Sequence, residues 1–304
     1  MVSMQDVYGA FVGSFGLNVR MMREMCQVHT VEIAPRPGTL LHLGDAPDSS
    51  CLLPLDYVIA PLVIVTHCWD AETIALACQI MQGRLRDATL VDIGANSGLF
   101  TRQMLGASRG FKHAFAYEPH PGNFKCLLHN TAPFEHVQAR NYALGPEAGT
   151  LEFHLDPDNC GNYSLNASAM PPGRDCATIS VAVKSADAEA RNWLAAGQPI
   201  FYKSDTQGHD EIIATAIGTE FWDHVFAGIF ELWRIEKPAW PAEKMSLLLD
   251  RFPHKRFLRD PATPVSTADI LAYVAGSDGA SVASSDGASV ASSDGASNDI
   301  MFWK

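Results

Sequence analysis

Short apolar runs alternate with helical patterns along the chain from about residue 88 onward. The clearest strand pattern is TLVDIG at residues 89–94, and apolar positions at helical spacing follow it from Gly98 to Leu105. Short strands that alternate with helices of about 10–15 residues are typical of βαβ units and a mainly parallel sheet. The pattern therefore predicts an α/β fold with helices on both faces of the sheet. Further strands are predicted at 113–119, 136–144, 151–155, 178–185, 199–205, 227–235, 254–259 and 299–304, and further helices at 122–130, 188–195, 209–217 and 242–252.

The first part of the chain has a different pattern. VHTVEI at residues 28–33 and TLLHLG at 39–44 predict two short strands, and the Pro and Gly residues between them predict a turn. A helical pattern over 71–85 leads into the first strand of the α/β region. We therefore expect an N-terminal region over residues 1–86 and one α/β domain over residues 87–304.

One segment interrupts the α/β pattern near the end of the chain. Residues 277–297 repeat the unit SDGASVAS twice and begin it a third time. Ser, Gly, Ala and Asp dominate the repeat, so it cannot bury enough apolar surface to offset the entropy of ordering it. The sequence predicts a disordered insertion between the last two strands.

The composition indicates which binding partners and which cellular compartment to expect. The formal net charge is −12, and no cluster of Lys and Arg stands out along the chain. Proteins that bind nucleic acid or anionic membranes need such clusters, so neither partner is expected. The N-terminus has no signal-peptide pattern, and the seven cysteines form no CxxC pair, which argues against a zinc ribbon or a thioredoxin-like site. Reduced thiols and a cytoplasmic location are the expectation.

The strongest chemical signal is a glycine-containing turn after the first strand of the α/β region. Its pattern is D-x-G-x-N-x-G, and Glu118 ends the next strand, 24 residues after Gly94. A carboxylate there can accept hydrogen bonds from the ribose hydroxyls of an adenosine. An NAD site would require a glycine where Asn96 stands, so that the backbone could approach a pyrophosphate. The turn therefore favours S-adenosylmethionine over a nicotinamide cofactor, and a turn without any ligand is the remaining alternative.

Three motifs in this order give a resemblance to a known family. VDIGANSGLFT (91–101), AYEPHPGNFKCLLHN (116–130) and YKSDTQGHDEIIATAIG (202–218) resemble the FkbM family of class I methyltransferases, over about residues 88–235. The chain departs from the family at His209-Asp210, where a small residue and Glu are common, and in its repeat insertion. The resemblance implies a Rossmann-like fold whose seven-stranded, mostly parallel sheet ends in an antiparallel strand. It also implies O-methylation of a hydroxyl on a small-molecule or carbohydrate acceptor, with S-adenosylmethionine as the methyl donor.

The resemblance also assigns roles to individual residues. Glu118 would hold the ribose of the donor, and Ala143, within residues 141–144, would lie near the adenine. Independently of the resemblance, we expect residues 1–86 to cover the cofactor edge of the sheet as a cap. The turn residues that would line the methionine part of the donor are Asp92, Gly94, Asn96 and Gly98.

The third motif supplies the candidate catalytic residues. Lys203 and Asp205 are two residues apart on a predicted strand, so they share one face of it. Two interpretations remain open: the pair only fixes the turn, or Asp205 or His209 accepts the proton of the acceptor hydroxyl. Glu231, at the end of the next strand, is expected near Asp205 because adjacent strand ends meet at one edge. No third ligand accompanies these two carboxylates, so no metal site is predicted.

Two functions from other classes remain possible on the sequence alone. One is an NAD-type oxidoreductase, and the other is a non-catalytic protein that binds S-adenosylmethionine. The sequence does not identify the acceptor, the position methylated or the oligomeric state.

Overall fold

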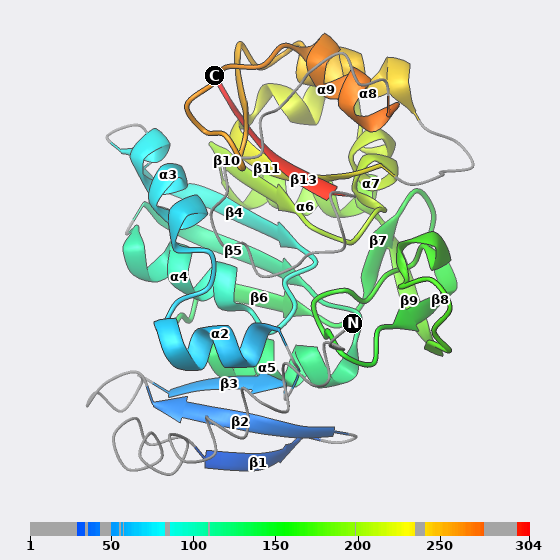
Figure 1. Cartoon of the computed structure of the whole chain (residues 1–304). Helices are drawn as coiled ribbons and strands as arrows, with labels where there is room; N and C mark the ends of the chain where they lie inside the picture. The colour runs from blue at the N-terminus through cyan, green and yellow to red at the C-terminus, as the bar shows by residue number, and fades with distance from the viewer. Residues whose placement is uncertain are drawn as a thin grey trace.

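The structure is a computed structural model in which residues 29–33, 36–42, 50–54, 56, 58–82, 86–108, 110–197, 199–234, 241–276 and 297–304 are described. Figure 1 shows a central twisted sheet with helices on both faces, a small sheet on one side, and a three-stranded sheet of the N-terminal region at one end. The α/β class predicted from the alternating pattern is confirmed.

The central sheet has seven strands within the described residues, in the order β12-β13-β11-β10-β4-β5-β6. Its last strand in the sequence, β13, runs antiparallel to both of its neighbours, whereas the other pairs are parallel. The predicted mostly parallel sheet with a final antiparallel strand is therefore confirmed. The strands are β4 (Ala88–Ile93), β5 (Phe111–Tyr117), β6 (Val137–Arg140), β10 (Ile200–Ser204), β11 (Val225–Trp233), β12 (His254–Phe257) and β13 (Ser297–Trp303).

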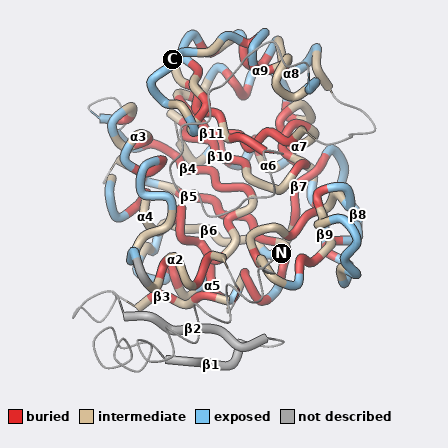
Figure 2. The backbone as a smooth tube through the Cα atoms, in the orientation of Figure 1, coloured by how far each residue is buried: buried red, intermediate tan, exposed pale blue. Residues whose placement is uncertain are grey.

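The central strands β4, β10 and β11 are buried on both faces, which explains why they are mostly apolar. Successive side chains of a strand point to opposite faces, so Leu90 joins one hydrophobic cluster and Val91 the other. Figure 2 shows the buried residues concentrated along the central strands. One face is covered by α3 (Ala71–Met81), α4 (Leu99–Ala107) and α5 (Pro121–Thr131), and the other by α6 (Ala186–Ala196), α7 (Asp210–Ala216), α8 (Ala242–Leu249) and α9 (Thr267–Val274).

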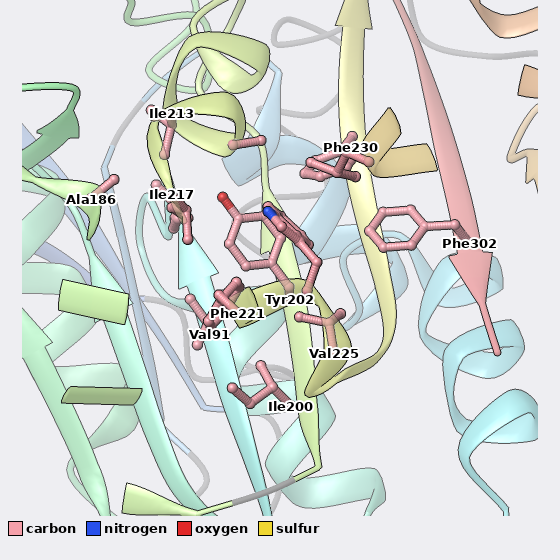
Figure 3. Close-up of a cluster of buried hydrophobic side chains, with 14 of the residues drawn as sticks. Val91, Ala186, Ile200, Tyr202, Ile213, Ile217, Phe221, Val225, Phe230 and Phe302 are labelled. Atoms are coloured by element: carbon pink, nitrogen blue, oxygen red, sulfur yellow. The ribbon is translucent and has the colours of Figure 1, made fainter. Parts of the chain in front are cut away.

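The cluster on the second face is rich in aromatic rings. Tyr202 packs edge-on against Trp222 and Phe230, with ring centroids 5.0 and 5.5 Å apart. Figure 3 shows Phe230 beside Phe302 of the antiparallel strand, and the two rings stack with their centroids 4.7 Å apart. This packing ties β10, β11 and β13 into one rigid unit, and the carboxyl ends of β10 and β11 carry polar residues.

One predicted strand is broken in two. The sequence predicted a single strand over 136–144, but β6 ends at Arg140 and β7 (Ala143–Gly145) joins a second sheet. The cause is Asn141, whose side-chain amide donates to the carbonyl oxygens of Glu118 at 2.9 Å and Pro119 at 3.1 Å, which turns the chain between the two strands. The second sheet, in the order β7-β9-β8, also contains β8 (Gly149–Leu155) and β9 (Ala177–Ser185).

The N-terminal region contains the two predicted strands, β1 (His29–Ile33) and β2 (Arg36–His42), and two further elements. These are β3 (Ser50–Pro54) and helix α2 (Ile59–Thr66), which the sequence analysis did not predict. The β1-β2-β3 sheet adjoins α5, because Asn130 bonds both the amide and the carbonyl of Leu52 at 2.7 Å. Helix α3 belongs to the predicted N-terminal region but packs against the α/β core. The domain boundary between residues 86 and 87 therefore stays a prediction.

The SDGASVAS repeat lies outside the described residues except for Ser297, which is the first residue of β13. Among the described helices, none is long and apolar enough to span a membrane.

Candidate functional site

A cavity of about 1250 Å³ opens at the carboxyl ends of the central strands. From β4 the chain continues to β5 and β6 on one side, and it later returns to β10 on the other side of β4. At such a switch point the strand ends leave a crevice, and open α/β sheets bind their ligands there. The residues directly after β4, β5 and β10 all line the cavity: Gly94, Glu118 and Asp205.

The turn after β4 brings its backbone close to β10. Gly94 has φ 75°, and a Cβ at this position would lie 1.8 Å from the carbonyl oxygen of Asp205. Glycine is therefore required there for both conformation and space. Asn96 also has a left-handed backbone, with φ 51°, a conformation that asparagine adopts more readily than most residues. Both Gly94 and Asn96 line the cavity.

Two other residues of the motif lie behind the turn and are not among the described residues that line the cavity. Gly98 has φ 78° and precedes α4, and a Cβ there would lie 2.6 Å from Cδ1 of Leu127 on α5. Asp92 is completely buried, and its Oδ2 accepts a hydrogen bond from the Thr101 hydroxyl at 2.6 Å. Gly98 thus allows α5 to approach, and Asp92 anchors α4 to β4.

Glu118 is a buried carboxylate beside the turn. Only 4% of its surface is exposed, and its two oxygens accept the backbone N–H of Asn96 at 2.9 Å and of His120 at 2.7 Å. Burial raises the pKa of Glu118 to about 8, although both backbone hydrogen bonds act in the opposite direction. Two side-chain acceptors that line the same part of the cavity, Oδ1 of Asn96 and Oδ1 of Asn123, are buried and have no hydrogen-bond partner among the described residues.

A polar loop between β8 and β9 encloses this part of the cavity. The carbonyl oxygen of Cys160 accepts the side-chain amides of Asn96 and Asn123, each at 3.2 Å. Tyr163 packs edge-on against His120, with ring centroids 4.8 Å apart. Ala143, 7% exposed at the start of β7, lines the cavity as well. The sequence analysis assigned no role to this loop, although the Asn, Asp and Gly residues of DPDNCGN indicate a tightly turned segment.

Lys203 connects β10 with β4. Its Nζ lies 3.0 Å from Oδ1 of Asp92, 3.1 Å from the carbonyl oxygen of Gly94 and 3.5 Å from Oδ2 of Asp205. Burial alone would lower the pKa of Lys203, but the carboxylates of Asp92 and Asp205 outweigh it and raise that pKa. Lys203 therefore remains charged and holds the two strand ends in register. This contact is compatible with a Lys203–Asp205 pair that only fixes the turn, and also with an Asp205 that accepts the proton of an acceptor hydroxyl.

Asp205 and Glu231 face the cavity together, joined by Gln207. The Gln207 side-chain amide donates to Asp205 at 2.7 Å and to Oε1 of Glu231 at 3.1 Å, and its backbone N–H donates to Oε2 of Glu231 at 3.0 Å. The Asp205 side chain is 40% exposed. Burial raises the pKa of Glu231 well above its ordinary value, and the neighbouring charges of Asp205 and Asp299 add to this.

The two residues that depart from the family pattern lie away from this surface. His209 directly precedes α7 and is not among the described residues lining the cavity. Asp210 is fully buried, and its Oδ1 accepts the Ser204 hydroxyl at 2.5 Å and the Thr206 N–H at 3.0 Å. Burial and the charge of Glu211 raise the pKa of Asp210 to about 7. Asp210 thus fixes the turn that presents Asp205.

The polar residues of the cavity wall that the sequence analysis did not single out include Asp70, Asn298 and Asp299. Asp70 precedes α3, and the other two lie on β13, where Asp299 is directly opposite Glu231. These residues lie far from the motifs in the sequence, so the sequence did not associate them with the site. The folded arrangement of the strands brings them there. In the described part of the chain, no group of three or more His, Cys, Asp or Glu is arranged to hold a metal ion.

Comparisons with known proteins give distant structural likenesses. No protein-family profile matches the chain, and no curated protein matches it by sequence. Among solved structures, the chain is similar to methyltransferase FkbM from Methylobacillus flagellatus KT, with 16% identity, a TM-score of 0.32, and coverage of 49% of this chain and 35% of that one. The matched part thus spans about a third of that protein's length.

Two further structures match over more of their length. A precorrin-6y C5,15-methyltransferase from Geobacter metallireducens GS-15 has 13% identity and a TM-score of 0.33, covering 78% of this chain and 94% of that one. A fibrillarin pre-rRNA processing protein from Methanococcus jannaschii has 11% identity and a TM-score of 0.35, covering 91% and 97%. Likenesses at this level carry no function to this chain, so the function has to be argued from the site.

Proposed function

We propose that this chain is an S-adenosylmethionine-dependent methyltransferase that methylates a hydroxyl group of a small-molecule or carbohydrate acceptor. The observation that carries the proposal is the buried Glu118 carboxylate beside the Gly94–Asn96 turn, at the switch point of the sheet. Fold-level analogy with the FkbM family agrees with it, and the family assignment itself is part of the proposal.

The donor fits the polar atoms that are present. Within the described part of the chain, Oδ1 of Asn96 and Oδ1 of Asn123 are buried acceptors without a partner next to Glu118. A buried unsatisfied acceptor costs about 1–3 kcal/mol, so a ligand with hydroxyl or amino donors at this place is favoured. A ribose and an adenine supply such donors. Glu118 would hold the ribose, Ala143 would contact the base, and Gly94 and Asn96 would line the methionine part.

A dinucleotide fits the same surface poorly. In nicotinamide enzymes a backbone N–H of the glycine turn faces the pyrophosphate, but here the N–H of Asn96 is bonded to Glu118 at 2.9 Å. The Asn96 side chain stands where that fold needs a glycine. Lys203, the cation nearest the turn, is engaged by Asp92 at 3.0 Å. The carboxylate of Asp205, which lines the same cavity, would repel a pyrophosphate, and this argues against an NAD-type oxidoreductase.

The chain's own residues would act mainly by positioning. When bound, the donor supplies a methyl group that its sulfonium already activates. Lys203 fixes the end of β10 against β4, and Gln207 orients the carboxylate of Asp205 toward the cavity. Asp205 would accept the proton of the acceptor hydroxyl as general base. The loop around Cys160 would help to exclude water from the donor. Transfer of the methyl group to the acceptor oxygen depends mainly on holding the two reactants in the correct orientation away from water.

The proposal is tested by incubating the purified chain with S-adenosylmethionine and a library of hydroxylated compounds, and measuring S-adenosylhomocysteine formed. Turnover with at least one hydroxylated acceptor supports it. Donor binding without turnover on any acceptor would instead favour a non-catalytic binding protein, and NAD binding without donor binding would refute the assignment.

A further inference from the structure

The polar loop between β8 and β9 is bonded to both halves of the site. On the donor side, the carbonyl oxygen of Cys160 accepts the side-chain amides of Asn96 and Asn123, each at 3.2 Å. Further along the loop, the Ser164 hydroxyl donates to the carbonyl oxygen of Gln207 at 2.7 Å. Gln207 belongs to the turn that follows β10. One loop therefore contacts the turn after β4, helix α5 and the turn after β10.

Ser164 is held by its own contacts and lies behind the cavity wall. It is completely buried, and it is not among the described residues that line the cavity. Its backbone pairs with His154 of β8, through N···O distances of 2.8 and 3.1 Å. Its hydroxyl accepts the N–H of Asn166 at 2.8 Å. A hydroxyl has one proton to donate, and here that proton points to Gln207, so Ser164 acts on the site through Gln207.

Hydrogen bonds stiffen the part of the loop between Cys160 and Ser164. Oδ2 of Asp156 accepts the side-chain amide of Asn162 at 2.9 Å, and Oδ1 of Asp156 accepts the N–H of Asn159 at 3.3 Å. The N–H of Asn162 donates to the carbonyl oxygen of Asn159 at 3.1 Å. Coupling between two sites is carried by a continuous network of bonded and packed groups. These bonds supply such a network, so a shift at Cys160 reaches Ser164.

Gln207 has an unfavourable backbone conformation that several hydrogen bonds hold. Its φ is 57°, in the left-handed region that most residues other than glycine and asparagine seldom adopt. Such a conformation persists where the surrounding structure determines it. The backbone N–H of Gln207 donates to Glu231 at 3.0 Å, and its side-chain amide donates to Glu231 at 3.1 Å and to Asp205 at 2.7 Å. The bond from Ser164 holds the other backbone group, the carbonyl.

The carboxylate of Asp205 takes its orientation from Gln207. The Asp205 side chain is 40% exposed, so packing does not fix it. Its Oδ1 accepts the Gln207 amide at 2.7 Å, whereas its Oδ2 lies 3.5 Å from Nζ of Lys203. A catalytic group misplaced by about 1 Å can lose about a hundredfold in rate. A small displacement of Gln207 therefore has a large effect on a reaction that uses Asp205.

We propose that Ser164 is a positioning residue for methyl transfer, which connects the loop around Cys160 to the general base Asp205 through Gln207. This inference rests on the proposed function of the site. Binding of the donor orders the loop, and the Ser164 hydroxyl passes that order to the turn after β10. Asp205 then faces the acceptor hydroxyl in the productive direction when the donor is in place.

The first test uses S-adenosylhomocysteine and amide hydrogen exchange, and it needs no acceptor. Saturating S-adenosylhomocysteine should slow the exchange of residues 205–209 at least about threefold more in the wild type than in Ser164→Ala, because that variant lacks the link to the loop. Ser164→Cys nearly keeps the shape of the side chain but donates only weakly, so it gives the same result if the alanine variant does not fold.

Ser168→Ala is the matched control, since Ser168 is an exposed serine of the same loop. It should behave as the wild type does in this experiment. Equal protection of residues 205–209 in the wild type and in the Ser164 variants would overturn the inference.

The second test measures rates with the hydroxylated compound that gives the most S-adenosylhomocysteine in the acceptor screen. In single turnover at saturating donor, Ser164→Ala and Gln207→Asn should each be at least about tenfold slower than the wild type, while donor affinity and acceptor KM stay within about twofold. Asparagine tolerates the left-handed backbone at this position, but its shorter side chain does not bridge the two carboxylates.

The double variant shows whether Ser164 acts through Gln207. It should be no more than about twofold slower than Gln207→Asn alone, because the link from Gln207 to Asp205 is already broken there. Effects of the two substitutions that multiply, or a raised acceptor KM with an unchanged rate, would overturn the inference.

Failure of the inference and failure of the proposed function give different results. If S-adenosylhomocysteine does not bind the wild type, the proposed function fails. If it binds, and residues 205–209 respond to it equally in the wild type and in Ser164→Ala, the proposed function stands and the coupling through Ser164 fails.

Discussion

Glu118→Gln is the substitution that bears most directly on the donor site. It keeps the shape of the side chain and removes the charge that would strengthen hydrogen bonds from the ribose hydroxyls. Hydrogen bonds to a charged acceptor contribute about 1.5–3 kcal/mol and those to a neutral one about 0.5–1.5 kcal/mol. A loss of about 1–2 kcal/mol corresponds to roughly 5–30-fold weaker binding of S-adenosylhomocysteine. The exposed Glu152 on β8 provides the control Glu152→Gln, which should bind as the wild type does.

The same residue predicts a pH dependence of binding. The pKa of Glu118 is raised to about 8, so the empty protein holds a proton there at pH 6–7. Hydroxyl donors favour the ionised form, so binding should release that proton, and affinity should rise with pH up to about 8 and then level off. Isothermal titration at pH 6, 7 and 8, in buffers of different ionisation enthalpy, measures both quantities. A wild-type affinity independent of pH over this range, or a Glu118→Gln variant that keeps the dependence, would refute this reasoning.

Three further predictions concern the turn, the general base and the repeat. Asp205→Asn should keep donor affinity and slow methyl transfer by about 10²–10⁴-fold in single-turnover experiments at saturating donor; an unchanged rate would exclude Asp205 as the base. Gly94→Ala should abolish donor binding, because its Cβ would lie 1.8 Å from the Asp205 carbonyl oxygen, whereas Gly98→Ala meets a flexible Leu127 tip at 2.6 Å and should mainly lower the melting temperature. Equal effects of Gly94→Ala and Gly98→Ala on donor binding and on the melting temperature would contradict these different roles. Deleting residues 277–296 should leave donor binding unchanged, since a long loop costs little more to close than a short one; an unfolded product would contradict the predicted disorder.

The central sheet was predictable because its strands are buried on both faces. Runs such as TLVDIG and GIFELW are mostly apolar, and the helices between them have a clear period. Strand β3 and helix α2 were not predicted, since periodicity alone does not distinguish short buried strands from short buried helices. The break between β6 and β7 depends on where the Asn141 amide finds its partners, which is a tertiary contact.

The residues of the candidate site were also predictable only in part. The glycine turn, Glu118 and Asp205 could be placed from the sequence because each directly follows a predicted strand, and strand ends meet at one edge. Asp299 and Asn298 could not, because they reach that edge only through the insertion of β13 between β11 and β12. Gln207 bridges Asp205 and Glu231 through a left-handed backbone with φ 57°, which its position in the motif does not reveal.

The most direct test of the central claim is a pair of titrations on the wild-type chain, one with S-adenosylhomocysteine and one with NAD, each repeated on Glu118→Gln. The account predicts saturable one-to-one binding of S-adenosylhomocysteine that weakens roughly 5–30-fold in the variant, and no saturable binding of NAD. Saturable NAD binding with no binding of S-adenosylhomocysteine would contradict it.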